Sequence, residues 1–179
     1  MDIEKKSFRI FIGLPIGENL QDKILKFEKK FKNLPVRWIL PHNLHITLVP
    51  PWYENDIEGI KEKLKFFDLG KSFRISFYKV EYGPSKKFPR LIWAVGDIPK
   101  ELLILRQNLF NILNQKPEQR DFKLHLTLAR FNFNSKIKLP EINESVYWED
   151  EIKEVVLFHS HLLKTGAEYE VIARFKVGM

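Results

Sequence analysis

Hydrophobic and polar residues follow two periods along this chain, and the pattern changes repeatedly from one to the other. Apolar residues alternate with others from 8 to 14, which predicts a half-buried strand. They then recur at helical spacing at 16, 20, 24, 27 and 31. The same reasoning predicts further strands at 36–40, 45–49, 73–82, 91–95, 123–131, 152–163 and 168–177, and further helices at 57–67 and 99–112. This mixture predicts an α+β protein with helices packed against antiparallel sheet.

Prolines and polar stretches set the expected ends of these elements. Pro50 and Pro51 directly follow the strand at 45–49, and we expect them to end it because proline cannot donate to a ladder. After residue 131, a polar loop that contains Pro140 is expected to lead to the strand near 152. No Gly/Ser-rich linker divides the chain, so we expect residues 1–179 to form a single domain.

A short segment occurs twice in the chain. NLHITL at 43–48 reappears as KLHLTL at 123–128, each time after a stretch with a predicted helix. Duplication of a lobe would place the two copies on equivalent strands, related by a pseudo-twofold axis. The histidines of the two copies, His45 and His125, would then face one central cleft.

Each copy presents an imidazole beside a hydroxyl. Residues two apart on a strand share a face, so His45 points the same way as Thr47, and His125 the same way as Thr127. A neutral imidazole can take a proton from an attacking water, and a protonated one can give a proton to a departing oxygen, because the histidine pKa of about 6.5 lies near working pH. The Thr hydroxyls can donate to phosphate oxygens. The pair of motifs therefore predicts phosphodiester cleavage that requires no metal and no cofactor.

The remaining histidines carry weaker signals. His159 and His161 share a strand face, and a metal pair is conceivable, but neither a third ligand nor a zinc motif such as H-E-x-x-H is apparent. We therefore expect a solvated or structural role for both. His42 lies in a predicted turn and is expected at the surface. The sequence thus predicts no metal site.

The composition favours one class of binding partner and one cellular compartment. Lys and Arg number 30 against 23 Asp and Glu, and the net charge of +7 favours a polyanion such as nucleic acid. The absence of cysteine excludes disulfides and thiolate chemistry. There is no apolar run of about eighteen residues and no signal-peptide pattern at the start, so we expect no membrane contact and a cytoplasmic location. We expect the chain to act as a monomer.

Five segments spread over nearly the whole chain match one family pattern. They are FRIFIGLP at 8–15, VRWILPHNLHITL at 36–48, RLIWAVG at 90–96, HLTLARF at 125–131 and SHLLKTGAEY at 160–169. On these segments the chain resembles the two-histidine (2H) phosphoesterases, specifically the LigT-like RNA 2′,3′-cyclic phosphodiesterases, historically named 2′-5′ RNA ligases. The resemblance implies a bilobal 2H phosphoesterase fold over residues 1–179, with two pseudo-symmetric lobes of antiparallel sheet, helices on the outside and a central cleft. It also implies opening of an RNA-terminal 2′,3′-cyclic phosphate to a 2′-phosphomonoester.

The resemblance also assigns roles to single residues. Carried over by motif, His45 would protonate the departing O3′ and His125 would activate the water, with Thr47 and Thr127 binding the phosphate. Arg130, at the end of HLTLAR, matches an arginine with which the family often contacts the nucleotide. Strict alternation puts Arg130 on the face opposite His125, so it reaches the cleft only if the strand ends or twists there. The alternative is an arginine paired at the end of the sheet.

The chain departs from the family pattern at two positions. Relatives usually follow the first motif with an aromatic residue and a glycine, whereas this chain reads VPPWYE. Trp52 or Tyr53 is therefore expected to stack on the base, with core packing as the alternative for Trp52. Proline usually precedes the second motif, and here that residue is Leu124, which a strand accepts readily.

Three alternative functions stay open. They are 2′-5′ ligation of RNA, phosphodiesterase action on another cyclic nucleotide, and a non-catalytic RNA-binding module. Both motifs keep their histidine and threonine, which argues against the non-catalytic alternative. A turnover assay on a 2′,3′-cyclic nucleotide separates these classes.

Overall fold

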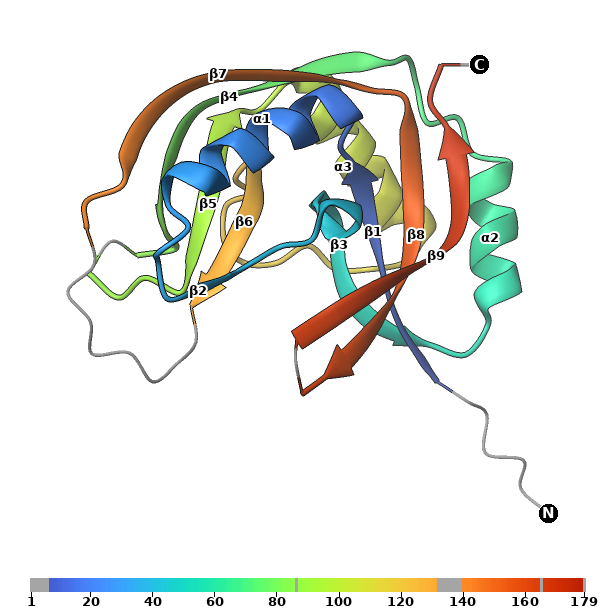
Figure 1. Cartoon of the computed structure of the whole chain (residues 1–179). Helices are drawn as coiled ribbons and strands as arrows, with labels where there is room; N and C mark the ends of the chain where they lie inside the picture. Colours follow the sequence, from blue (N-terminus) through green and yellow to red (C-terminus); the bar gives the residue numbers. More distant parts are fainter. Residues whose placement is uncertain (1–6, 86, 132–139, 165, 179) are drawn as a thin grey trace.

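The computed structural model describes residues 7–85, 87–131, 140–164 and 166–178. Within them the chain forms two antiparallel sheets and three α-helices, which confirms the predicted α+β class (Figure 1). The four-stranded sheet has the order β3–β1–β8–β9, formed by His45–Glu54, Phe8–Pro15, Glu154–Leu163 and Gly166–Lys176. The five-stranded sheet has the order β2–β6–β5–β4–β7, formed by Val36–Trp38, His125–Phe131, Leu91–Asp97, Phe73–Gly83 and Asn143–Ile152.

The three helices, α1 (Glu18–Lys30), α2 (Ile57–Lys65) and α3 (Lys100–Ile112), each bury an apolar stripe. Because apolar residues recur at helical spacing, one face of each helix joins the core while lysines and glutamates stay in water. Among the described residues, buried side chains of both sheets and all three helices form one large cluster, and Phe11, Val156 and Phe158 form a second, smaller one. No helix in this part of the chain has the length and apolar composition needed to cross a membrane.

The two sheets contain equivalent strand–helix–strand units. β1, α1 and β3 form the first unit, and β5, α3 and β6 the second; in each, the two strands pair antiparallel. Thr47 on β3 lies opposite Gly13, and Thr127 on β6 lies opposite Trp93. β3 and β6 also contact each other. The repeated motif thus occupies the same place in both units, as a duplicated lobe predicts.

The strand that carries the first motif is longer than the sequence predicts. β3 continues through Pro50 and Pro51 to Glu54. It lies at the edge of its sheet, with β1 as its only neighbour there, so the missing proline N–H groups remove no bond from a central ladder. The register with β1 also shifts on both sides of Ile12, which accommodates the prolines in an irregular ladder.

The sequence does not predict strand β7, because the composition of this segment is mostly polar. The sequence predicts a polar loop before residue 152, whereas Asn143–Ile152 pairs with β4 as an edge strand. Trp148 and Ile152 are buried, at 7% and 1% exposure. An edge strand with one face in water needs few apolar residues, so its alternation is weak in the sequence. Residues 132–139 of the predicted loop lie outside the described residues.

Candidate active site

The second motif lies on β6, where a β-bulge decides which side chains share the face of His125. His125 and Thr127 are partly exposed, while Leu126 and Leu128 are buried, as strand alternation predicts. Ala129 is also buried and Arg130 is exposed. The ladder explains this, because β6 advances two residues where β5 advances one between the pairs Thr127–Trp93 and Ala129–Ile92.

This bulge corrects the expected position of Arg130. A bulge inserts one unpaired residue and resets the alternation of the strand. Arg130 therefore lies on the same face as His125 and Thr127, and strict alternation, which puts it on the opposite face, is wrong here. Burial is the main cause that lowers the pKa values of His45 and His125, and the guanidinium charge of Arg130 acts on both in the same direction.

The first motif contains the equivalent bulge. Leu48 and Val49 are consecutive buried residues on β3, and the register with β1 shifts at the same point. The residue that corresponds to Arg130 is Pro50. The two halves thus place the same histidine and threonine on the partly exposed face of their strand, whereas only the second half places an arginine at this position.

The two imidazole rings are held in the same way. Nδ1 of His45 lies 2.7 Å from the carbonyl oxygen of Asn43, and Nδ1 of His125 lies 2.9 Å from that of Lys123. A carbonyl oxygen only accepts, so Nδ1 of each ring must carry the proton and donate it. This fixes the tautomer, and Nε2 is the nitrogen left to exchange a proton with a substrate.

Aromatic rings enclose His45. The ring centroids of Phe11 and Tyr169 both lie 4.9 Å from its centroid, and that of Phe158 lies 5.7 Å away. Burial among these rings is the main cause that lowers the pKa of His45 to about 4; the carbonyl bond opposes it, and positive charge on Arg130 and His125 acts in the same direction as burial. β1 is therefore buried on both faces, not half-buried as its alternation predicts, because Phe11 supports His45 from the second face.

His125 lies against an indole ring. The centroid of Trp93 on β5 is 5.0 Å from that of His125. Burial is the main cause of a lowered His125 pKa, and Arg120 and Arg130 act in the same direction. Near neutral pH, both histidines of the free protein are therefore largely neutral, because both pKa values lie below the ordinary value of about 6.5.

A pocket of about 240 Å³ opens beside the motifs. Its walls come from the β2–η1 segment, where η1 is Pro41–Asn43, from the end of β6 and from the β8–β9 hairpin. Arg130 and Tyr169 both line it, so the pocket connects the arginine of the second motif to one of the aromatic rings that enclose His45. The remaining lining residues are Arg37, Trp38, Ile39, Leu40, Asn43, Gly166, Ala167 and Glu168.

Comparison with known proteins identifies this arrangement. Residues 14–93 match the family described as LigT-like phosphoesterase. A relative from Methanocaldococcus jannaschii, named RNA 2′,3′-cyclic phosphodiesterase, is 30% identical over 171 residues, which cover 92% of this chain and 98% of the relative. The chain belongs to the LigT-like phosphoesterase family. A second relative of the same name, from Archaeoglobus fulgidus, is 28% identical over 180 residues, covering 94% and 99%.

Solved structures share the fold of this LigT-like phosphoesterase. TT0787 of Thermus thermophilus matches with a TM-score of 0.78 at 21% identity, covering 94% of this chain and 97% of that one. LigT of E. coli, solved in complex with 3′-AMP, matches with a TM-score of 0.76 at 18% identity, covering 97% and 100%. At these identities the likeness concerns the fold, and it confirms the bilobal 2H phosphoesterase architecture.

Trp52 and Tyr53 are not brought to the histidines. Trp52 pairs with Ile10, a core residue, and its ring packs against the core cluster. Tyr53 is 68% exposed. It lies eight residues along β3 from His45, a separation of about 26 Å in an extended strand. In their place, the aromatic residues that line the pocket are Trp38 and Tyr169, which the motif comparison does not single out.

Proposed function

We propose that this chain hydrolyses RNA-terminal 2′,3′-cyclic phosphates to 2′-phosphomonoesters, with His45 and His125 as the acid–base pair. One observation carries the proposal: two His–Thr pairs on equivalent strands, each imidazole oriented by a backbone carbonyl two residues earlier. The name of the two curated relatives, RNA 2′,3′-cyclic phosphodiesterase, supports this substrate. The same arrangement supports a single bilobal domain over residues 1–179.

The reaction needs one proton accepted and one donated. Water attacks phosphorus while one imidazole takes its proton, and the bond from phosphorus to O3′ breaks while the other imidazole protonates O3′. The product carries the phosphate on O2′ and a free 3′ hydroxyl. By family motif, His125 activates the water and His45 protonates O3′. Two imidazoles are sufficient for these transfers, so we propose a reaction in which no metal takes part.

Three further groups complete the proposed site. The hydroxyls of Thr47 and Thr127 share the histidine face and would donate to the non-bridging oxygens. Arg130 adds a fixed positive charge to the lining of the pocket, where it would bind the phosphate or the nucleotide. Tyr169 and Trp38 offer aromatic surface to the base.

A general acid must carry a proton, whereas the lowered pKa values of the two histidines favour their neutral forms. In the free protein both rings are largely neutral at pH 7, because burial and Arg130 disfavour their charged forms. A bound phosphodiester brings a negative charge beside them, which favours an imidazolium and raises both pKa values. The acid therefore acquires its proton together with the substrate.

The decisive experiment is a turnover assay with product analysis. A 2′,3′-cyclic nucleotide and an oligoribonucleotide that ends in a 2′,3′-cyclic phosphate are each incubated with the protein. We expect the 2′-phosphate as the single product from both. Joining of RNA halves instead would favour the ligase alternative, and binding of the oligonucleotide without turnover would favour the RNA-binding module.

The pH dependence should differ between kcat/KM and kcat. The pH profile of kcat/KM reports the free protein, in which the pKa values of both histidines are lowered. The maximum of kcat/KM should therefore lie below about pH 6.5, and kcat/KM should fall at higher pH. The alkaline limb of kcat should lie at higher pH, because bound phosphate raises the pKa values. Both profiles are measured with a cyclic mononucleotide. Profiles flat from about pH 5 to 9, a range that brackets the histidine pKa, would contradict acid–base catalysis by this coupled pair.

A further inference from the structure

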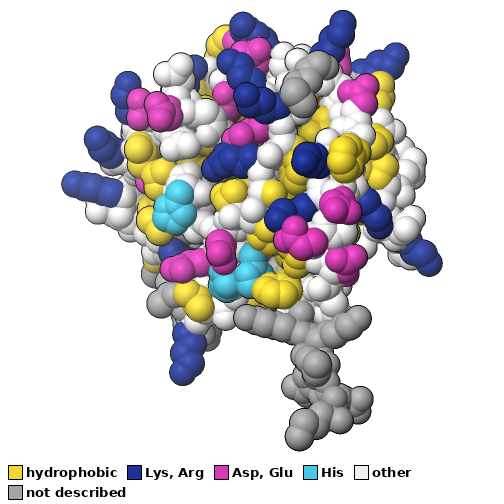
Figure 2. All heavy atoms as spheres, turned by 90° about the vertical axis from the view of Figure 1, so that its right-hand side faces the viewer, with side chains coloured by type: hydrophobic (Ala, Val, Ile, Leu, Met, Phe, Trp, Pro, Cys, Tyr) yellow, Lys and Arg dark blue, Asp and Glu magenta, His cyan; other side chains and the backbone are white. Residues whose placement is uncertain are grey.

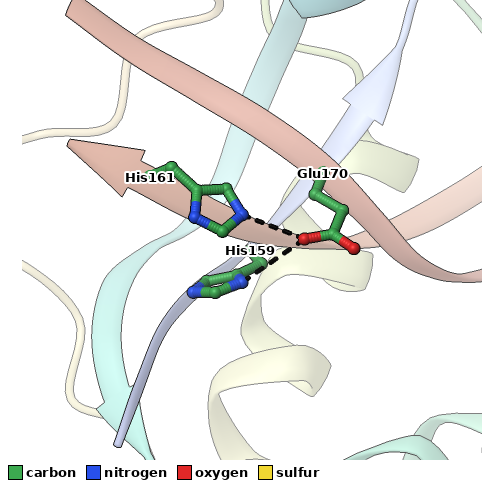
Figure 3. A group of neighbouring side chains, drawn as sticks. All are labelled: His159, His161 and Glu170. Atoms are coloured by element: carbon green, nitrogen blue, oxygen red, sulfur yellow. Dashed lines mark hydrogen bonds and ion pairs between the residues drawn. The ribbon is translucent and has the colours of Figure 1, made fainter. Parts of the chain in front are cut away.

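A second histidine cluster lies on the face of the four-stranded sheet opposite the candidate active site. His159 and His161 share one face of β8, and Glu170 of β9 lies directly opposite His159 in the ladder (Figure 3). Neighbouring residues of a strand point to opposite faces. Phe158 and Tyr169, which contact His45, thus point to the cleft, while His159 and Glu170 point away from it.

The ligand atoms of this cluster converge on a small volume. Nε2 of His161 lies 2.9 Å and Nδ1 of His159 lies 3.6 Å from the same carboxylate oxygen of Glu170, as Figure 3 shows. Among the described residues, one ligand atom from each side chain falls within 4.8 Å of the others. Zinc bonds of about 2.0–2.2 Å at tetrahedral angles place ligand atoms about 3.3–3.5 Å apart. The two distances to the Glu170 oxygen bracket that range, and ligand atoms of all three side chains lie within 4.8 Å of one another.

We propose that His159, His161 and Glu170 bind a divalent transition-metal ion, with Zn²⁺ as the best match. Two imidazoles and one carboxylate suit zinc and its neighbours, whereas Mg²⁺ and Ca²⁺ prefer oxygen ligands alone. Three protein ligands leave one tetrahedral position for water. The sequence does not reveal this site, because the third ligand comes from the register of the β8–β9 ladder and not from a local motif.

The surroundings favour a cation despite the positive net charge of the chain. A pocket of about 400 Å³ adjoins the cluster, and Asp56 and Glu58 line it together with His159 and Glu170. Figure 2 shows acidic side chains beside histidines on this side of the molecule. The side chains of His161 and Glu170 are 40% and 66% exposed, so an ion can enter from solvent.

An ion at this place would act on the structure and not on the reaction. It would link β8 to β9, the hairpin whose other face carries Phe158 and Tyr169 beside His45. We therefore expect the bound ion to stabilise the hairpin and the folded state. The site is independent of the proposed phosphodiesterase activity, because its ligands point away from the cleft.

The test is a zinc titration of chelator-treated protein, followed by calorimetry and thermal unfolding. We expect one ion per chain and a Tm raised by about 5–10 °C when free zinc exceeds its Kd about 100-fold. His161→Gln and Glu170→Gln should each weaken binding by at least the ~10–100-fold that loss of a supporting partner costs. Co²⁺ gives a second readout, because nitrogen coordination in a tetrahedral site produces visible absorption.

His42→Gln is the matched control, since it removes another exposed histidine and should leave binding unchanged. Wild-type affinity in the His161 and Glu170 variants, or no 1:1 binding in the wild type, would overturn the site. So would loss of binding in a His45→Ala/His125→Ala variant that retains the cluster. Turnover of the chelated protein reports separately on the phosphodiesterase proposal and should equal that of the zinc-bound protein. The two proposals can therefore fail independently.

Discussion

His45→Ala and His125→Ala are each expected to lower kcat for a 2′,3′-cyclic nucleotide by about 10²-fold or more, the usual scale for a lost general acid or base. Each substitution removes an Nε2 that can exchange a proton, along with the Nδ1 bond that orients the ring. Both rings are only partly buried, so we expect the fold to survive. The measurement is steady-state kinetics, with circular dichroism to confirm folding.

The double variant tests whether the two histidines act as one catalytic unit. Groups that act as one catalytic unit are not additive, so His45→Ala/His125→Ala should lose little more than the worse single variant. His42→Ala is the control, because His42 lies three residues before His45 but is exposed in η1. Near-wild-type kcat in either single variant would remove that histidine from the chemistry. Independent, multiplicative losses would argue that the two rings act in separate steps.

The parts of this architecture that the sequence predicts depend on local pattern. The strand–helix succession at β1 and α1 follows from hydrophobic period alone. The motif on β6 repeats that on β3 residue for residue at His, Thr and the following Leu. Because these residues share a strand face wherever the strand lies, their common orientation needs no tertiary information.

The parts of the architecture that the sequence does not predict depend on how the strands pair and pack with one another. β7 and the second half of β3 are strands because they lie at sheet edges, where polar residues and prolines are tolerated. The aromatic wall of His45 brings Phe11, Phe158 and Tyr169 together from three strands. Glu170 reaches the histidines of β8 through ladder register alone. No local window contains these partners together.

The position of Arg130 depends on one β-bulge in β6, which the sequence does not reveal. Two buried residues in succession, Leu128 and Ala129, turn its side chain toward the cleft, where its charge acts on both histidines. The first motif supplies Pro50 at the equivalent place, so no second cation there can replace it. Loss of Arg130 should therefore affect both substrate affinity and the proton equilibria of the pair.

Arg130→Ala is expected to lower kcat/KM by about 10- to 150-fold, the equivalent of about 1.5–3 kcal/mol for a hydrogen bond to a charged group. Arg130→Lys should recover part of the loss, since it keeps the charge but not the planar donor fork. Removing the charge should also raise both histidine pKa values and move the alkaline limb of kcat/KM to higher pH. The measurement is a pH series of kcat/KM for wild type and both variants.

The matched control is Arg120→Ala. Arg120 lowers the pKa of His125 but is not among the causes acting on His45, and it forms an ion pair with Glu118. Arg120→Ala should therefore shift the pH profile through His125 alone and leave KM near the wild-type value, whereas Arg130→Ala should change both histidine pKa values and KM. An equal loss of kcat/KM in the two variants would mean that Arg130 acts only as a distant charge. A wild-type kcat/KM in Arg130→Ala, with an unshifted profile, would show that the bulge places this side chain on the cleft face without giving it a part in binding.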